Sequence, residues 1–245
     1  MINRHFRPSR RLFVALSMLA VGSSLSAQDA TEKSFVIDLG YVTTSGNTDV
    51  TTLNINQLYR FARMGWGLEE TFGTIYGTDD GTVNTSLWQA RLTGSRDLTE
   101  RLSAVAGVGW DRNRFAGIDN RYEEFLGLRY KFVNSPWDQL YGEVAAALIQ
   151  QDNRDGTSDD FPAARLTGGY KHNFSDAAYF EEVMEVIPNL EESKDYRLNN
   201  EMALIAPLSV ALSLKLSWIL RFDNRPPTDF SKTDTFFTAG LRLAF

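Results

Sequence analysis

Few side chains in this sequence are suited to covalent chemistry. After position 27 the sequence holds one histidine, His172, in the stretch Tyr170-Lys171-His172-Asn173. A serine nucleophile needs a histidine beside it and a third polar group that orients the ring, and the neighbourhood of His172 offers Asn173 and Ser175. A hydrolase of lipid or lipopolysaccharide that uses His172 is kept as an alternative. Our prediction is that the protein is not an enzyme.

The most acidic stretch, residues 152–160, could supply carboxylates to a cation. With Gly156 at the fixed glycine of a calcium loop, Gln151 and Pro162 would stand at the first and twelfth ligand positions, where carboxylates are needed. The stretch is therefore interpreted as a solvated surface loop. The sequence has no cysteine, so thiolate sites and disulfides are excluded, and phosphate-loop, dinucleotide and zinc spacings do not occur. We predict no metal and no cofactor.

The elements that carry the polar residues have the period of β-strands. From Leu208 to Phe222, and again from Phe237 to Phe245, large apolar residues alternate with smaller or polar ones. Successive side chains of a strand point to opposite faces, so a period of two indicates strands with one apolar face. Ten similar segments come before these two. The twelve predicted strands cover residues 35–41, 53–61, 66–77, 88–94, 102–110, 122–132, 140–148, 164–174, 179–187, 196–204, 208–222 and 237–245.

Residues 1–27 have the composition of a secretory signal. A basic start that contains Arg4 and Arg7 precedes an apolar stretch over 12–25, and the small residue Ala27 suits cleavage. The apolar stretch is shorter than the roughly 20 residues of a spanning helix. We expect residues 28–245 to form one exported domain. Removal of the four signal arginines lowers the formal net charge from −6 to −10, which offers no attraction to nucleic acid.

Twelve alternating strands in an exported chain predict an all-β fold, a transmembrane up-and-down antiparallel β-barrel in the bacterial outer membrane. Hydrocarbon does not tolerate unpaired backbone groups, so a spanning sheet must close. An even number of strands, with longer loops after odd strands and short turns after even ones, places both ends in the periplasm. Aromatic residues near the strand ends predict two interfacial girdles. The periplasmic girdle would contain Tyr59, Phe61, Trp66, Tyr130, Phe132, Trp137, Phe174 and Phe245, and the opposite one Tyr41, Tyr76, Trp110, Tyr122 and Phe222.

Charged residues fall mostly on the face opposite the large apolar ones. A charge that faces lipid near the midplane costs about 2–4 kcal/mol, so these residues are expected to line the lumen. Three carboxylates, Glu70, Glu124 and Glu182, fall on the lipid face instead, either beyond the hydrocarbon or because the register slips at a bulge. The predicted lumen residues are Arg60, Glu69, Arg91, Glu123, Arg129, Glu143, Arg165, Glu181, Glu185, Arg197, Glu201, Lys215, Arg221 and Arg242.

Several short segments resemble one known family. They are the signal, the first alternating strand, the loop Ser45-Gly46-Asn47-Thr48, the segments 222–227 and 233–235, and the last strand that ends in Phe245. Together they resemble the salt-induced outer membrane protein family of Gram-negative bacteria, the YdiY-like proteins. The resemblance implies an outer membrane barrel of unknown function with an association to salt or osmotic stress.

The alternating end of the chain, with Leu241, Leu243 and Phe245, resembles the signal read by the barrel-assembly machinery of outer membranes. The expected partners are that machinery, periplasmic chaperones, outer membrane lipids and lipopolysaccharide. Twelve strands lie between small barrels that side chains fill and large barrels that leave a channel. Two functions therefore stay open: a narrow or gated channel for small solutes or ions, and a closed structural or stress-responsive envelope barrel.

Overall fold

The fold is taken from a computed structural model that describes residues 31–43, 50–227 and 230–245. The predicted signal and the loop motif Ser45-Gly46-Asn47-Thr48 lie outside the described residues. In the described ranges twelve strands follow one another, with one short 3-10 helix, η1, at Arg114–Ala116. The strands are β1 (Glu32–Thr43), β2 (Val50–Arg63), β3 (Trp66–Asp79), β4 (Thr82–Asp97), β5 (Leu102–Asn113), β6 (Ile118–Asn134), β7 (Asp138–Asn153), β8 (Ser158–Asn173), β9 (Tyr179–Pro188), β10 (Tyr196–Pro207), β11 (Leu212–Asp223) and β12 (Thr233–Ala244).

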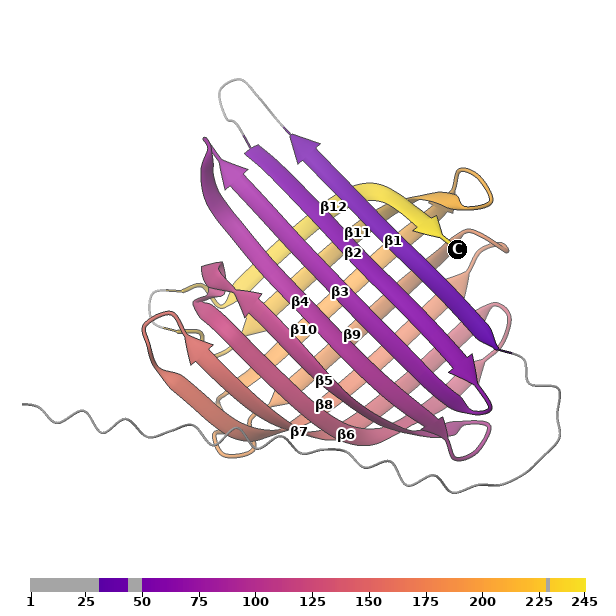
Figure 1. Cartoon of the computed structure of the whole chain (residues 1–245), viewed down its shortest axis with the longest axis horizontal. Helices are drawn as coiled ribbons and strands as arrows, with labels where there is room; N and C mark the ends of the chain where they lie inside the picture. The colour runs from indigo at the N-terminus through magenta and orange to yellow at the C-terminus, as the bar shows by residue number, and fades with distance from the viewer. Residues whose placement is uncertain (1–30, 44–49, 228–229) are drawn as a thin grey trace, which may run out of the picture.

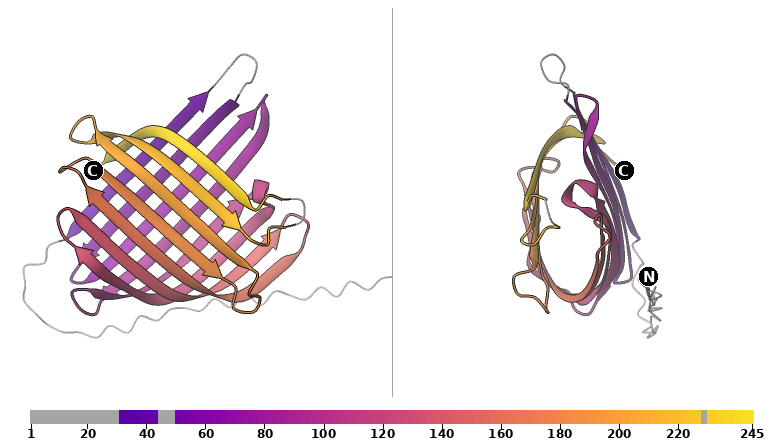
Figure 2. Two further views of the ribbon diagram at one scale, coloured as in Figure 1. Left: turned by 180° about the vertical axis from the view of Figure 1, so that it is seen from behind. Right: turned by 90° about the vertical axis from the view of Figure 1, so that its left-hand side faces the viewer.

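Each strand pairs with its neighbours in the sequence, and β12 returns to pair with β1 (Figure 1). All pairs are antiparallel, so the sheet is a closed up-and-down barrel, which confirms the predicted fold and number of strands. Seen toward one end, the strands form a flattened ring (Figure 2). Within the described part of the chain, no helix is long and apolar enough to cross a membrane.

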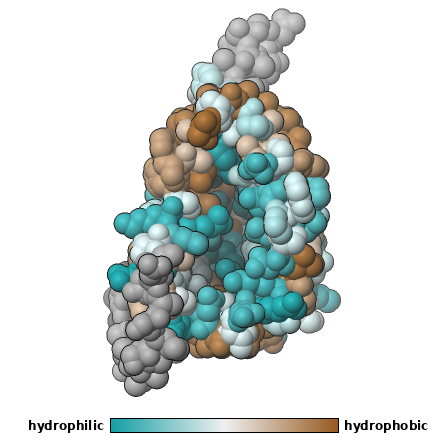
Figure 3. Space-filling model, turned by 90° about the vertical axis from the view of Figure 1, so that its right-hand side faces the viewer, coloured by the Kyte–Doolittle hydropathy of each residue, from teal (hydrophilic) through white to brown (hydrophobic). Residues whose placement is uncertain are grey.

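The two faces of the strands differ as the alternation predicts. Large apolar side chains such as Leu126, Phe132 and Val144 point outward and are 62 %, 57 % and 55 % exposed. Viewed along the barrel, hydrophilic side chains surround the central hollow and hydrophobic ones lie at the margin (Figure 3). An apolar wall of this extent is unfavourable in water and favourable in lipid, so the exterior is built to contact a membrane.

Aromatic side chains are exposed toward both ends of the barrel wall. Nine members of the two predicted girdles are exposed. They are Tyr41, Tyr76 and Tyr122 toward one end, and Trp66, Tyr130, Phe132, Trp137, Phe174 and Phe245 toward the other. Tyr59, Phe61, Trp110 and Phe222 are partly buried. Amphipathic rings at the strand ends suit the boundary between hydrocarbon and water.

Several predicted strand bounds differ from the observed ones, although Asp80-Gly81 forms a turn with positive φ as its residue types predict. The acidic stretch 152–160 is mostly strand, because β7 and β8 continue their pairing up to Asp152 opposite Ser158. The connection between β3 and β4 is a two-residue turn, Asp80-Gly81, whose residues have φ angles of 47° and 73°. β11 begins at Leu212 rather than at residue 208, because the amides of residues 208 and 209 both donate to the Leu212 carbonyl in a turn. An alternation of apolar and polar residues does not reveal strand ends that are polar or turns that are apolar.

The seam that closes the barrel is its shortest pairing. β1 and β12 share five register pairs, from Val36 opposite Ala244 to Gly40 opposite Gly240, whereas β8 and β9 share eight. A Cβ atom on Gly240 would overlap the carbonyl oxygen of Leu39, so only glycine lets the two backbones approach there. Residues 233–239 of β12 pair with β11 alone.

Candidate functional site

The inward side chains enclose a cavity of about 540 Å³ inside the barrel. Every strand contributes to its lining, from Asp38 of β1 to Arg242 of β12. All fourteen charged residues predicted to face inward lie on this lining. The alternation within each strand therefore places the charged side chains together, in a lumen shielded from the lipid.

Sequence reasoning overlooked several charged residues of the lumen. Asp38, Asp111, Arg121, Asp223 and Asp234 also line the cavity. Each could have been found from the alternation of side chains along its strand. Asp38 is next to the outward Leu39 and so faces inward, and Arg121 is two residues from the inward Glu123 and so faces the same way. Asp111, Arg121, Asp223 and Asp234 stand near strand ends or among polar residues, where the alternation is weak. Asp38 stands in the middle of β1 between Ile37 and Leu39, so the alternation there was sufficient to find it.

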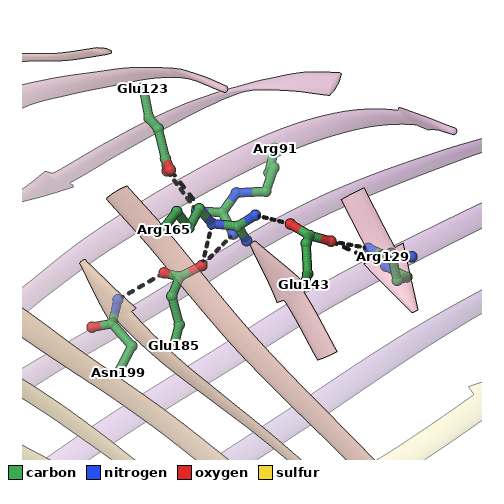
Figure 4. A network of polar contacts seen from close by, with 7 residues as sticks. All are labelled: Arg91, Glu123, Arg129, Glu143, Arg165, Glu185 and Asn199. Atoms are coloured by element: carbon green, nitrogen blue, oxygen red, sulfur yellow. Dashed lines mark hydrogen bonds and ion pairs between the residues drawn. The ribbon is translucent and has the colours of Figure 1, made fainter. Parts of the chain in front are cut away.

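The centre of the lumen is crossed by a network of arginines and glutamates, which we call the central network (Figure 4). Arg165 of β8 donates to Glu143 at 2.6 Å and to Glu185 at 2.5 Å, and lies 3.4 Å from Glu123. Arg91 of β4 donates to Glu123 at 2.8 Å and to Glu185 of β9 at 3.1 Å. Because β4 and β9 are five strands apart in the ring, these contacts bridge opposite walls.

The central network is extended by one more arginine and is charge-balanced. Arg129 donates twice to the second oxygen of Glu143, at 3.0 and 2.8 Å, so three arginines face three glutamates. The guanidinium of Arg129 lies 5.0 Å from the ring centre of Tyr141, and that of Arg165 lies 4.5 Å from the ring centre of Phe125. The negative ring faces add to the attraction that holds both cations in place.

A second network, the seam network, lies beside the pairing of β1 with β12. Asp38 accepts two bonds from Arg242, at 2.6 and 2.8 Å, and one from Lys215 at 2.7 Å. Arg242 also donates to Glu181 at 2.9 Å, and Lys215 lies 3.5 Å from Glu201. These contacts join β1, β9, β10, β11 and β12, so they reinforce a seam with few backbone pairs.

Burial decides how much these ion pairs matter. Arg165 and Glu143 are each 5 % exposed, and removing one partner of such a buried pair costs about 3–5 kcal/mol. By contrast, the side chains of the pair Arg60 and Glu69 are 59 % and 35 % exposed at 2.7 Å separation, and an exposed pair contributes about 0–1 kcal/mol. The central network is therefore a structural bridge across the lumen as well as its lining.

His172 lies on the outer wall, in β8. Its Nδ1 is 2.8 Å from an Asp138 oxygen that also accepts the Tyr170 hydroxyl at 2.8 Å. The Ser175 hydroxyl accepts the backbone N–H of Ala178 at 3.0 Å within its own turn. The serine beside His172 in the sequence therefore serves the turn, and the Asp138 contact fixes the imidazole at the barrel rim. Within the described ranges, no group of His, Asp or Glu side chains could hold a metal ion.

The three carboxylates that break the pattern do lie on the outer wall. Glu70 stands between Tyr59 and Leu92 in the sheet, and Glu124 between Val108 and Leu148. Glu182 accepts a hydrogen bond from Asn200 at 2.8 Å. The register shifts of β3 and β6 occur at other positions, so a slipped register is not the reason for these outward carboxylates.

The closed sheet, the apolar wall and the charged lumen together define a membrane-spanning β-barrel. Residues 37–245 match the family described as "Protein of unknown function, DUF481". The chain belongs to this family. Among curated proteins, none matches the sequence.

Three solved structures illustrate the likeness of fold. The NanC porin is 10 % identical, with 85 % of this chain and 97 % of that chain covered and a TM-score of 0.49. An outer membrane channel from Pseudomonas putida F1 is 13 % identical, with 91 % and 97 % covered and a TM-score of 0.47. An anion-selective porin from Comamonas acidovorans is 10 % identical, with 89 % and 100 % covered and a TM-score of 0.43. These values assign no substrate to this chain, and the salt-induced resemblance stays a prediction.

Proposed function

We propose that this protein is a narrow, gated channel for small hydrophilic solutes or ions in the bacterial outer membrane. The observation that supports it most is the cavity of about 540 Å³, which is lined by every strand and carries charges of both signs. Its lining extends from Arg60 and Glu69, near the end where β1 begins and β12 ends, to Asp223 and Asp234, near the opposite end. Such a lining suits water and charged solutes rather than lipid.

The central network is the proposed gate. Arg91 reaches across the lumen from β4 to Glu185 of β9 and shares Glu123 and Glu185 with Arg165, so opening a path at this level requires some of these pairs to separate. Ionic strength weakens ion pairs that water can reach. The side chains of Arg91 and Arg129 are 31 % and 28 % exposed to the lumen, which gives a physical basis for a link to salt. If the ion pairs of the central network never separate, the protein is a closed envelope barrel. Single-channel recording distinguishes the gated channel from the closed barrel.

Export and assembly belong to the same proposal. Residues 1–27 would direct export, and the barrel-assembly machinery would recognise Leu241, Leu243 and Phe245 after delivery by periplasmic chaperones. Leu241 and Phe245 are 43 % and 71 % exposed on the outer wall, which supports their availability to a partner before insertion. Lipid and lipopolysaccharide would then cover the apolar wall.

Single-channel recording tests the proposal. Protein purified from outer membranes is placed in a planar bilayer, and currents are recorded in 0.1 M and 1 M salt, about a threefold change in Debye length. We expect discrete currents whose open fraction rises with salt. Charge reversal of Lys215 and Arg221, which line the cavity, is expected to shift ion selectivity, and the same change at Arg101, exposed in a turn, is not. A folded barrel that stays silent in both salts contradicts the channel and favours the closed barrel.

A further inference from the structure

One buried arginine of the lumen donates to no carboxylate among the described residues. Arg197, the second residue of β10, is 5 % exposed and lines the cavity. Its guanidinium lies 5.6 Å from the ring centre of Phe161. Among the described residues it forms no ion pair, and its Nη2 atom is buried without a hydrogen-bond partner. Buried polar groups are almost always paired, so this donor points to a missing acceptor.

A second arginine beside it is only partly engaged. Arg121 of β6 donates its Nε hydrogen to Gln151 at 2.8 Å. Its terminal nitrogens lie 3.6 Å from Asp111 and 3.7 Å from Asp223, which is longer than a hydrogen bond. Its Nη2 is likewise buried without a hydrogen-bond partner. Arg121 and Arg197 are near enough to act on each other electrostatically, so two cations share one region with unengaged N–H groups.

The acidic neighbours do not fill this role. Asp111, Asp223 and Asp195 act on Arg197 through their charge, yet none of them forms a hydrogen bond with it. They reduce the mutual repulsion of the two arginines and hold them in the lumen. The contrast with the central network is clear, because there Arg165 donates to Glu143 and Glu185 at 2.6 and 2.5 Å.

A third arginine lies next to the pair along the sheet. Arg221 of β11 lines the same cavity and is one strand away from Arg197. It stands opposite Asp234 in the register but forms no ion pair with it among the described residues, and its hydrogen bond goes to the neighbouring Leu220 carbonyl at 3.4 Å. The planar, forked guanidinium matches carboxylate and phosphate oxygens better than any other side chain.

We propose that Arg121 and Arg197 form an oxyanion-binding site in the lumen, with Arg221 as an approach charge, and that the site takes the carboxylate or phosphate group of a small hydrophilic solute. An oxyanion between the two guanidinium groups would accept from the two Nη2 atoms, which have no hydrogen-bond partner in the structure. The selection of solutes by this site rests on the proposed channel, and it would make small oxyanions the class of solute that the channel takes. Binding itself needs no conduction.

Equilibrium binding tests the site on the full chain purified in detergent. Isothermal titration with inorganic phosphate and, separately, with acetate, against chloride at equal ionic strength, distinguishes the two oxyanion classes. We expect saturable binding of at least one probe, weakened at least tenfold in Arg197→Gln. The matched control is Arg60→Gln, a lumen arginine already paired with Glu69, for which we expect unchanged binding.

Two more variants separate a binding role from a structural one. Asp223→Asn removes a negative charge 3.7 Å from Arg121 and is expected to tighten oxyanion binding severalfold, which loss of structure would not do. If Arg197→Gln fails to show the gel shift of a folded barrel, Arg197→Lys keeps the charge without the fork and is expected to bind more weakly than the wild type.

The outcomes also distinguish this site from the channel. If the protein binds phosphate or acetate but never conducts, the oxyanion site is supported and the channel is contradicted. A protein that conducts without saturable binding, or whose binding falls equally in Arg60→Gln, overturns the site.

Discussion

At the scale of residues, the arginines of the lumen differ in what their N–H groups contact. Arg165 and Arg242 donate to two carboxylates each, at distances between 2.5 and 2.9 Å. They fix one strand to another across or around the barrel. Arg197 has the same chemistry and similar burial without a carboxylate partner. The first group therefore stabilises the barrel and forms the proposed gate, and Arg197 belongs to the proposed oxyanion site.

Loss of Arg165 should be costly. The substitution Arg165→Gln leaves buried Glu143 and Glu185 with less compensating charge, so we expect a loss of about 3–5 kcal/mol in unfolding free energy. Urea unfolding of the protein in lipid vesicles, followed by the gel shift of the folded barrel, measures it. Arg60→Gln, in the exposed pair with Glu69, should cost about 1 kcal/mol or less. Equal losses in the two variants would contradict a bridging role for Arg165.

An outward carboxylate should be a site of stabilisation. Glu124 faces the outer wall between Val108 and Leu148, which are 52 % and 54 % exposed. Glu124→Leu removes a charge from the lipid face and should raise the unfolding free energy by about 1 kcal/mol. Unfolding in vesicles of a single lipid provides the measurement, and Glu100→Leu in an exposed turn is the control. A destabilised Glu124→Leu would indicate that this carboxylate contacts a partner rather than lipid.

At the scale of elements, the hairpin turns decide how the strands follow one another. Met64-Gly65 and Asp80-Gly81 are both two-residue turns with positive φ at both positions, 53° and 74° in the first and 47° and 73° in the second. This geometry is that of a type I′ turn, which favours Asn-Gly or Asp-Gly. Asp80-Gly81 fits the preference and Met64 does not.

The Met64 turn can therefore be improved. Met64→Asn should stabilise the barrel by about 1 kcal/mol, because a left-handed conformation costs about 1–2 kcal/mol for most L-residues and less for asparagine. Arg96 donates to the Met64 carbonyl at 2.5 Å, a contact that the substitution leaves in place. The unfolding midpoint in vesicles reports the change. Asp80→Met, the reverse replacement in the sister turn, should be destabilising by a similar amount, and a neutral effect in both would contradict the argument.

The seam between β1 and β12 should open before any other pairing. It has five register pairs, and residues 233–239 are paired on one side only. Amide hydrogen exchange reports backbone bonds that break locally, so peptides from β1 and from residues 233–239 should exchange before those from β6 and β7. Mass spectrometry of the protein in detergent measures this order. Equal protection of the seam and of the β6–β7 pairing would refute it.

At the scale of the whole molecule, the barrel separates two environments. Its apolar outer wall suits lipid, and its lumen collects charges that would each cost about 2–4 kcal/mol near the middle of the lipid face. Closure satisfies the sheet edges that lipid would penalise, and Phe35 and Phe245 complete it with backbone bonds of 2.9 and 2.8 Å. The seam network then holds the first and last strands together from inside.

Assembly in cells should depend on Phe245 more than the folded barrel does. Phe245 is 71 % exposed, so Phe245→Ser removes little packing. We expect the amount of protein in outer membranes to fall severalfold while refolding into lipid vesicles is unchanged. Immunoblotting of separated membranes measures the first quantity and the gel shift the second. A variant that reaches the outer membrane normally would argue against recognition of this residue by the assembly machinery.

The sequence by itself determined the class of the fold and the face of each strand. Alternation from Leu212 to Phe222 or from Tyr122 to Phe132 depends on local geometry alone, since each residue reverses the side-chain direction. It therefore predicted twelve strands and fourteen of the charged side chains that line the lumen. It misjudged the connections at residues 152–160 and 208–211 and began the fourth strand at residue 88 instead of Thr82, because turn geometry depends on backbone bonds between strands and not on hydropathy.

Only the tertiary structure decided which charges meet. Arg91 and Glu185 are 94 positions apart, and Arg242 and Asp38 are 204 apart, so their pairing depends on the stagger between strands and on how the ring closes. The same closure leaves Arg197 without a carboxylate. The alternation within a strand can predict that a residue faces the lumen. Its position along the barrel axis and its partner depend on the registers of all the strand pairs around the barrel, and the sequence of one strand does not contain them.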